Sequence, residues 1–206
     1  MYFVKTPFWL KRIFKSYTWD VNTAEKELYL TFDDGPHPVA TPFVLQQLAD
    51  FEARASFFCL GKNVVEYPVI YKDIVAGGHT IGNHTHNHLN GWNTPHDVYV
   101  DNVDRASACI SSGLFRPPYG RISNKAGKLL KNKGFSIIMW DVLSGDFDLS
   151  ISPEKCKENV VNKAQNGSII VFHDSQKAFN NLQYALPEVL KHFALKGFVF
   201  KGLADN

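Results

Sequence analysis

The sequence lacks the features that mark disulfide-rich, zinc-finger and membrane-spanning proteins. Its three cysteines, Cys59, Cys109 and Cys156, lie far from one another in apolar or helical stretches. An odd number of cysteines, without C-x-x-C or Cys/His spacing, argues against both a disulfide framework and a thiolate-bound metal. We therefore expect reduced cysteines in the core, and any metal ion must be bound by histidine and carboxylate side chains.

Long apolar runs and an excess of charge of one sign are also missing. No stretch has the uninterrupted apolar length of a signal peptide or a transmembrane helix, so we expect a cytoplasmic or membrane-peripheral protein. The formal net charge is +2, with 22 Lys and Arg against 20 Asp and Glu, and no basic patch is interleaved with aromatic residues. Nucleic acid is therefore not an expected partner. Hydrophobic residues make up 45% of the 206 positions, which is enough for the core of one domain.

The first 22 residues are rich in aromatic and basic side chains and contain Pro7. A short segment of this kind is compatible with contact to an anionic membrane surface. Pro7 and the mixed pattern instead favour packing of the aromatic side chains on the body of the protein. We predict an N-terminal extension at 1–22, on or beside one main domain at 23–206. No sequence feature indicates an obligate protein partner.

Short β-branched and aromatic runs alternate with longer helical patterns in the rest of the sequence. This order is typical of parallel strands joined by covering helices, and most of the runs are apolar on both faces, as in a buried sheet. The predicted strands are Glu27–Asp33, Ala55–Leu60, Thr80–Asn83, Gly113–Pro117, Phe135–Val142, Ser168–His173 and Phe198–Lys201. The predicted helices are Thr41–Glu52, Val64–Ala76, Pro95–Ser112, Ser123–Lys133, Pro153–Gln165 and Asn181–Leu195.

Polar residues cluster where the predicted strands end. In a parallel α/β barrel, the carboxyl ends of all strands meet at one face and their loops form one site. A doubly wound open sheet would gather these residues less completely. The clustering therefore favours a barrel. The residues concerned are Asp33 and Asp34, His84 to His88, Arg116, Asp146 and His173.

Asp33 and Asp34 follow the buried-strand pattern of Leu28–Phe32 and precede Gly35 and Pro36. Because neighbouring side chains diverge at the end of a strand, one carboxylate can bind a metal ion while the other faces a metal-bound water. Asp-Gly-Pro is also an ordinary turn signal. Taken alone, the pair leaves both interpretations open.

Four of the eight histidines fall within His79–His88. His84 and His88 have the spacing of one helical turn, which allows them to direct two imidazole nitrogens at one cation. With Asp34 they form a two-histidine, one-carboxylate set that leaves positions open for water and substrate, as in a catalytic metal site. The sequence therefore predicts a divalent metal ion, Zn²⁺ first, with Co²⁺ as an alternative. A polar loop of solvated histidines is the competing interpretation.

The sequence contains five separated motifs, LTFDDGP, GHTIGNHTHNH, FRPPYG, WDVLSGDF and IIVFHD. Their order and approximate spacing resemble those of the polysaccharide deacetylase family, carbohydrate esterase family four. The resemblance spans Tyr29 to Asp174 and is specific, since five motifs coincide. It implies an α/β fold, a distorted, incomplete (β/α) barrel of TIM-barrel type with about seven parallel strands and outer helices. It also implies metal-dependent N-deacetylation.

The resemblance implies a role for each of the residues in the first two motifs. Asp33 matches the family's general base. Asp34 matches a metal ligand, and His84 and His88 match the histidines that complete the metal site. These roles agree with the ligand set that the residue types themselves suggest.

The later motifs supply the other groups of the implied reaction. Arg116 matches the arginine that pairs with the base, and Tyr119 matches the residue whose backbone N–H contacts the oxyanion. His173 matches the general acid, and Asp146 the carboxylate that orients it. An Asp–His pair favours the imidazolium, so His173 is expected to deliver a proton to the departing amine near neutral pH.

Two positions depart from the family's pattern. Leu143 stands where the family has an aspartate, and Phe147 where it has a tryptophan, so substrate preference is expected to differ. Phe147 retains an apolar wall for an acetyl group or a sugar ring. We expect His79 to be a buried structural partner and His86 to face solvent or substrate. The predicted substrate-binding residues are Pro118, Tyr119, Phe147 and Trp92.

These observations predict a metal-dependent hydrolase that removes N-acetyl groups from amino sugars. The expected partner is an acetylated amino-sugar saccharide, such as a chitooligosaccharide, peptidoglycan or an envelope glycan precursor. One alternative is hydrolysis of another acetamide or a cyclic amide at the same site, because a metal site does not define the leaving group. A carbohydrate-binding pseudoenzyme is a further alternative, disfavoured because the base, ligands and acid are all present.

Overall fold

The computed structural model of the chain describes residues 2–205. Met1 and Asn206 lie outside the described residues. The predicted division into an N-terminal extension at 1–22 and a main domain at 23–206 stays a prediction. No helix among the described residues is both long enough and apolar enough to cross a membrane.

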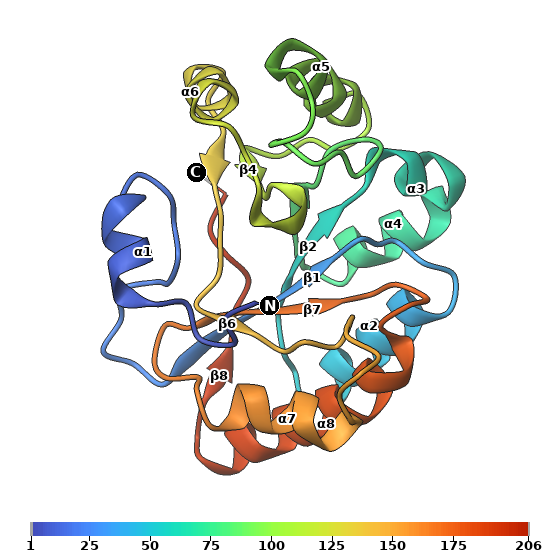
Figure 1. Cartoon of the computed structure of the whole chain (residues 1–206). Coiled ribbons are helices and arrows are strands. Elements are labelled where there is room, and N and C mark those ends of the chain that lie inside the picture. Colours follow the sequence, from blue (N-terminus) through green and yellow to red (C-terminus); the bar gives the residue numbers. More distant parts are fainter. Residues whose placement is uncertain (1, 206) are drawn as a thin grey trace.

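One curled sheet, in which all paired strands are parallel, forms the centre of the molecule (Figure 1). Its strands are β1 (Glu27–Asp33), β2 (Ser56–Cys59), β3 (Thr80–Asn83), β4 (Leu114–Phe115), β5 (Ser136–Ile137), β6 (Val142–Leu143), β7 (Ile169–His173) and β8 (Val199–Phe200). Seven of them follow the order β5-β4-β3-β2-β1-β7-β6, and β8 pairs with the beginning of β1. The prediction of a distorted, incomplete (β/α) barrel is confirmed.

Helices surround the sheet (Figure 1). They are α1 (Phe8–Ile13), α2 (Ala40–Asp50), α3 (Gly61–Glu66), α4 (Pro68–Ala76), α5 (His96–Ser107), α6 (Asn124–Asn132), α7 (Pro153–Val161) and α8 (Phe179–Leu195), with a 3₁₀ turn, η1, at Pro118–Gly120. Ser123 and Ser152 cap α6 and α7 by accepting hydrogen bonds from the backbone N–H of Ala126 and Lys155. The positions at which these two helices were predicted to begin are therefore confirmed.

Two predicted elements are each divided in two, and the helices predicted at Pro95–Ser112 and Pro153–Gln165 end earlier, at Ser107 and Val161. The single helix expected at Val64–Ala76 is two helices, because Pro68 has no N–H to continue the first helix and instead begins α4. The single strand expected at Phe135–Val142 is β5 and β6 with a connection at 138–141 between them. β5 and β6 are the opposite ends of the sheet order, so this short connection requires the sheet to curl until its edges approach each other.

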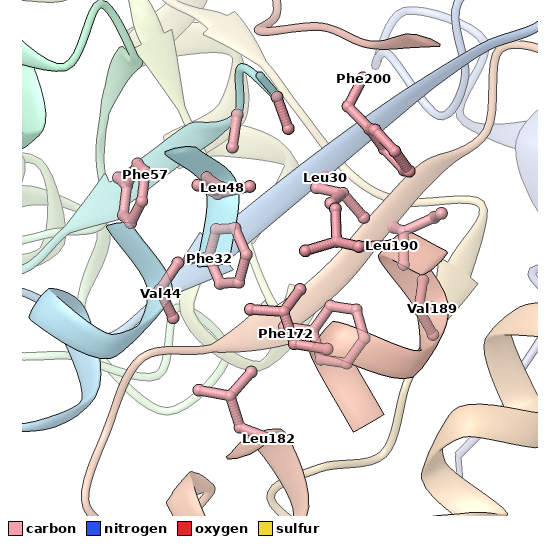
Figure 2. Close-up of a cluster of buried hydrophobic side chains, with 14 of the residues drawn as sticks. Leu30, Phe32, Val44, Leu48, Phe57, Phe172, Leu182, Val189, Leu190 and Phe200 are labelled. Atoms are coloured by element: carbon pink, nitrogen blue, oxygen red, sulfur yellow. The ribbon is translucent and has the colours of Figure 1, made fainter. Parts of the chain in front are cut away.

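Apolar side chains from β1 and β7 pack against α2 and α8 and form the largest core cluster. Figure 2 labels ten members of this cluster, which also includes side chains of β2 and β8: Leu30, Phe32, Val44, Leu48, Phe57, Phe172, Leu182, Val189, Leu190 and Phe200. β1 and β7 are apolar on both faces, and all of β1 after Glu27 is buried. The expectation of unpaired cysteines is also met, with Cys59 and Cys156 buried and Cys109 half-buried.

The segment before β1 occupies the gap between the two open edges of the sheet, with α1 beside it (Figure 1). Near the β5 edge, Thr18 forms a parallel bridge with Ile138. At the β6 edge, Lys5 forms an antiparallel bridge with Val142, and the Leu143 N–H donates to the Val4 carbonyl at 2.8 Å. These backbone bonds satisfy edge groups that an incomplete barrel would otherwise leave unpaired.

Asp141 connects this N-terminal segment to the barrel by side-chain bonds. Its buried carboxylate accepts hydrogen bonds from Lys5 at 2.5 Å, Lys11 at 2.6 Å and the Ser168 hydroxyl at 2.5 Å. Burial alone would raise the pKa of Asp141, but the bonds from Lys11, Lys5 and Ser168 outweigh it and the pKa is lowered. The ionised carboxylate therefore stabilises the folded state above the unfolded-state pKa of about 4, and this contribution is lost as the pH falls through the lower, folded-state pKa.

We predict that Asp141→Ala lowers the free energy of unfolding at pH 7 by about 2 kcal/mol, since it removes the acceptor of the Ser168 hydroxyl and one buried acceptor from each of two lysines. Urea denaturation measures the change. Asp104→Ala is the matched control, because Asp104 forms an exposed pair with Lys133 and its loss should cost below about 0.5 kcal/mol. Equal effects of the two substitutions would contradict this role of Asp141.

Candidate functional site

The carboxyl ends of β1, β3, β4 and β7 meet at one groove. The parallel register places Asp33, the last residue of β1, beside His173, the last residue of β7. The histidine cluster follows β3, and Arg116 follows β4. A cavity of about 520 Å³ lies over these ends, lined by Tyr2, Asp33, Asp34, His84, His88, Pro117, Tyr119, Arg121, Trp140, Leu143, Phe147, Val171, His173, Ser175 and Lys177.

Arg116 is fully buried beneath this groove and pairs with Asp33. Its Nη1 donates to Asp33 Oδ1 at 2.7 Å and to the Thr31 hydroxyl at 2.6 Å. Nε and Nη2 donate to the backbone carbonyls of Ile138 and Met139, and the guanidinium lies 4.1 Å from the ring centre of Phe58. Burial lowers the pKa of Arg116, while the Asp33 charge opposes that shift. The arrangement fixes the orientation of the Asp33 carboxylate.

Asp34, His84 and His88 bring three ligand atoms together within 4.8 Å of one another. Asp34 Oδ1 lies 3.1 Å from His88 Nε2 and 3.6 Å from His84 Nε2. Asp34 has φ of 77° and His88 φ of 59°, so the backbone turns sharply at both residues. Asn63 holds the first turn by donating its side-chain N–H to the Asp34 carbonyl at 2.7 Å.

The protonation states of this cluster suit a divalent cation. His84 Nδ1 donates to the Arg116 carbonyl at 2.7 Å, which leaves the Nε2 lone pair directed towards Asp34. Burial lowers the pKa of His84 to about 4, so its imidazole is neutral at pH 7. Burial would raise the pKa of Asp34, but the neighbouring His88 and the other imidazoles hold it below its usual value. Asp34 Oδ1 is also buried without a hydrogen-bond donor among the described residues, as expected of an atom that binds a metal ion.

His173 and Asp146 form a second pair on the other side of Asp33. Asp146 is fully buried and accepts two bonds from His173, from the backbone N–H at 2.6 Å and from Nδ1 at 2.7 Å. Burial would lower the pKa of His173, but the Asp146 charge and hydrogen bond, with smaller contributions from Asp34 and Asp33, raise it to about 9. The imidazole is therefore protonated at neutral pH and can act as an acid.

Tyr119 projects from η1 at the rim of the groove. Its φ of 60° breaks the 3₁₀ turn, and its ring packs 4.5 Å from that of His88. The neighbouring amides of Gly120 and Arg121 donate to Pro117 and Pro118, whereas no residue of the described chain accepts from the Tyr119 N–H. That amide is available to a ligand.

Three of the four predicted substrate-binding residues line two adjoining cavities, and the fourth, Pro118, lines neither. Phe147 and Tyr119 line the groove, and Phe147 packs edge-on against His173 with ring centres 5.2 Å apart. Pro118 is buried, and it is Pro117 that lines the groove. Trp92 lines an adjoining cavity of about 320 Å³, which shares Tyr2, Tyr119, Arg121, Trp140 and Leu143 with the groove. The substrate contacts of all four residues stay predictions.

The histidine cluster differs from its sequence-based description in two respects. His84 and His88 were expected to have the spacing of one helical turn, but they lie on an irregular loop. Positive φ angles at Thr85 and His88 turn the backbone so that the two imidazoles face the same point. His86 was expected to face solvent or substrate, but it is 7% exposed and lies against Gly61. His79 is half-buried, and its Nδ1 accepts from the Ala55 N–H at 3.3 Å.

Several residues that shape the site carry no signal in the sequence that would assign them a role. Thr31 and Asn63 are ordinary polar residues until the fold places them beside Arg116 and Asp34. Asp174 is fully buried, accepts from the Thr41 hydroxyl at 2.5 Å and lies so close to Gly35 that any side chain there would collide with it. In the sequence, the position of Asp174 directly after His173 indicates that it lies near the site but not what it does there.

The sequence and the fold both match proteins of established activity. The family model described as polysaccharide deacetylase matches residues 20–138, which include Asp33, Asp34, the histidines and Arg116. A peptidoglycan-N-acetylglucosamine deacetylase of Bacillus cereus is 32% identical over 91% of this chain and 91% of its own. A chitooligosaccharide deacetylase of Azorhizobium caulinodans is 33% identical over 73% of this chain and 74% of its own.

A solved structure shows the same architecture over almost the whole chain. The crystal structure of the Bc1960 peptidoglycan N-acetylglucosamine deacetylase, in complex with 4-naphthalen-1-yl-N-oxidanyl-benzamide, superposes with a TM-score of 0.88. It is 30% identical in sequence, and the match covers 96% of this chain and 95% of the other.

We predict that Arg116→Met lowers the free energy of unfolding by about 3–5 kcal/mol, because it leaves the buried Asp33 carboxylate without a counter-charge. Chemical denaturation measures this change, with the exposed Arg105→Met as the matched control. The double variant Asp33→Asn/Arg116→Met should lose less than the sum of the two single variants, since the unpaired charge is then absent. An additive result would show that the pair is not coupled.

Proposed function

Because the chain belongs to the polysaccharide deacetylase family, we propose that it uses a divalent metal ion to remove acetyl groups from the N-acetylglucosamine units of a saccharide. The general activity, N-deacetylation of an amino-sugar polysaccharide, follows from the family and its deacetylase relatives. The observation that carries the metal-dependent mechanism is the cluster of Asp34, His84 and His88 beside Asp33 and His173.

The proposed metal ligands are Asp34 Oδ1 and the Nε2 atoms of His84 and His88. Two imidazoles and one carboxylate suit Zn²⁺, with Co²⁺ as the alternative, and three protein ligands leave positions for water and substrate. The bound ion would polarise the acetamide carbonyl and lower the pKa of a bound water. All other steps are assigned to side chains of this protein and to the backbone N–H of Tyr119.

Asp33 is the proposed general base. The attacking water gives its proton to the Asp33 carboxylate, which Arg116 holds in place. As the water oxygen forms its bond to the acetamide carbon, negative charge develops on the carbonyl oxygen. The free N–H of Tyr119 is the proposed hydrogen-bond donor to that oxygen.

His173 is the proposed general acid. The carbon–nitrogen bond breaks only after the nitrogen is protonated, because an unprotonated amine anion is a very poor leaving group. With its pKa raised to about 9 by Asp146 despite burial, His173 has this proton at neutral pH. The products are acetate and the free amino sugar.

We predict that the purified protein releases acetate from N-acetylglucosamine oligomers, that chelation abolishes the activity and that Zn²⁺ restores it. Asp33→Asn should lower kcat by about 10³-fold, since the base is lost while the metal ligands remain. The exposed Asp104→Asn is the matched control and should retain full activity. Thermal unfolding of each preparation confirms that it is folded.

Two outcomes would contradict the proposal. Acetate release that persists after complete removal of metal would reject the metal-dependent mechanism. Zinc binding without acetate release from any amino sugar would redirect the search to other acetamides or cyclic amides.

A further inference from the structure

Two cationic side chains line the groove without an acidic partner. Arg121 and Lys177 are both exposed, and neither has a carboxylate oxygen within 4.0 Å among residues 2–205. The groove's own carboxylates face other residues, Asp33 the guanidinium of Arg116 and Asp34 the imidazoles of His84 and His88. Neither cation is therefore in direct contact with a carboxylate, and both line the groove.

Arg121 is held in place beside the histidine loop. Its guanidinium carbon lies 5.0 Å from the ring centre of Trp92, a cation–π contact that favours one orientation. A parallel β-bridge between Gly91 and Ile122 fixes the loops that carry the two side chains. A Cβ at Gly91 would lie 2.6 Å from the Arg121 carbonyl oxygen, so this close approach requires glycine.

Lys177 also lies near an aromatic ring, on the other side of the groove. Its ammonium lies 5.8 Å from the ring centre of Phe147, which also packs against His173 and Tyr2. The nearby Asp148 carboxylate is engaged by the hydroxyls of Ser150 and Tyr2, at 2.6 and 2.9 Å, and forms no ion pair with Lys177. Lys177 is therefore free to bind an anion.

The order of the strands places the two cations on either side of the reacting groups. Arg121 follows β4, the histidines follow β3, Asp33 ends β1 with Asp34 directly after it, and Lys177 follows β7. Since the sheet runs β4-β3-β2-β1-β7, the metal ligands and the base lie between Arg121 and Lys177. A saccharide lying across the groove would present its neighbouring units to these two side chains.

We propose that the groove binds an anionic glycan, in which Arg121 and Lys177 bind carboxylates on the sugars that flank the N-acetylated unit. This inference rests on the proposed function and names its substrate class. The planar guanidinium of Arg121 can bind a carboxylate with two parallel hydrogen bonds, while Lys177 acts as a point charge. A neutral chitooligosaccharide offers these cations only hydroxyl and amide oxygens, which form weaker hydrogen bonds than a carboxylate does.

The test compares two forms of one oligosaccharide, in which N-acetylglucosamine alternates with N-acetylmuramic acid. In one form the carboxylates are free, and in the other they are converted to primary amides, so the two differ only in charge. We expect wild-type kcat/KM for acetate release to be about tenfold higher on the free acid at low ionic strength, and this ratio to fall as salt is added.

Substitutions locate the source of this preference. Arg121→Gln and Lys177→Gln should each reduce the ratio, and the double variant should bring it close to one. Lys191→Gln, on the exposed surface of α8, is the matched control for the loss of one positive charge and should keep the wild-type ratio. A wild-type ratio near one, or an unchanged ratio in the double variant, would overturn the inference.

Binding separates this inference from the proposed function. Calorimetry on the Asp33→Asn variant gives the Kd of each oligosaccharide without requiring turnover, and the same tenfold preference is expected. If the free acid binds tighter but no acetate is released by the wild type, the anionic-glycan site stands and the deacetylase function fails. If both forms are deacetylated equally well, the function stands and the inference fails.

Discussion

The buried guanidinium of Arg116 is the interaction on which the rest of the site depends. It joins β1, through Thr31 and Asp33, to the connection between β5 and β6, through the carbonyls of Ile138 and Met139. Its own carbonyl accepts from His84 Nδ1 and so sets the tautomer of a proposed metal ligand. One residue therefore orients the proposed base, directs a proposed ligand and holds the curled sheet, at the cost of burying a charge that Asp33 balances.

The pKa values of His84 and His173 are shifted in opposite directions. Near the proposed metal, burial lowers the pKa of His84 to about 4, so that its imidazole is neutral and able to bind a cation. At the far side of Asp33, the fully buried Asp146 overcomes the effect of burial and raises the pKa of His173 to about 9. Two histidines of the same ordinary pKa thus suit the proposed roles of ligand and acid, His84 because of burial and His173 because of its carboxylate neighbour.

The sequence predicted the fold class, most strands and the residues that meet at the strand ends, because apolar runs and polar strand ends are local patterns. It did not predict the break at Pro68 within the helix expected at Val64–Ala76, although the proline itself was the signal. The role of Thr31 and the burial of His86 depend on which distant segment packs against them, and no local pattern encodes that contact. The closure of the sheet by residues before β1 depends likewise on long-range pairing, as in the bridge between Thr18 and Ile138.

The central claim is that Asp34, His84 and His88 bind one divalent metal ion at the base of the groove. The most direct test is anomalous diffraction at the zinc absorption edge, from crystals grown with one equivalent of Zn²⁺. We expect a single strong peak at about 2.0–2.2 Å from Asp34 Oδ1 and from the Nε2 atoms of both histidines. No peak at this position, or a peak bound by other residues, would contradict it.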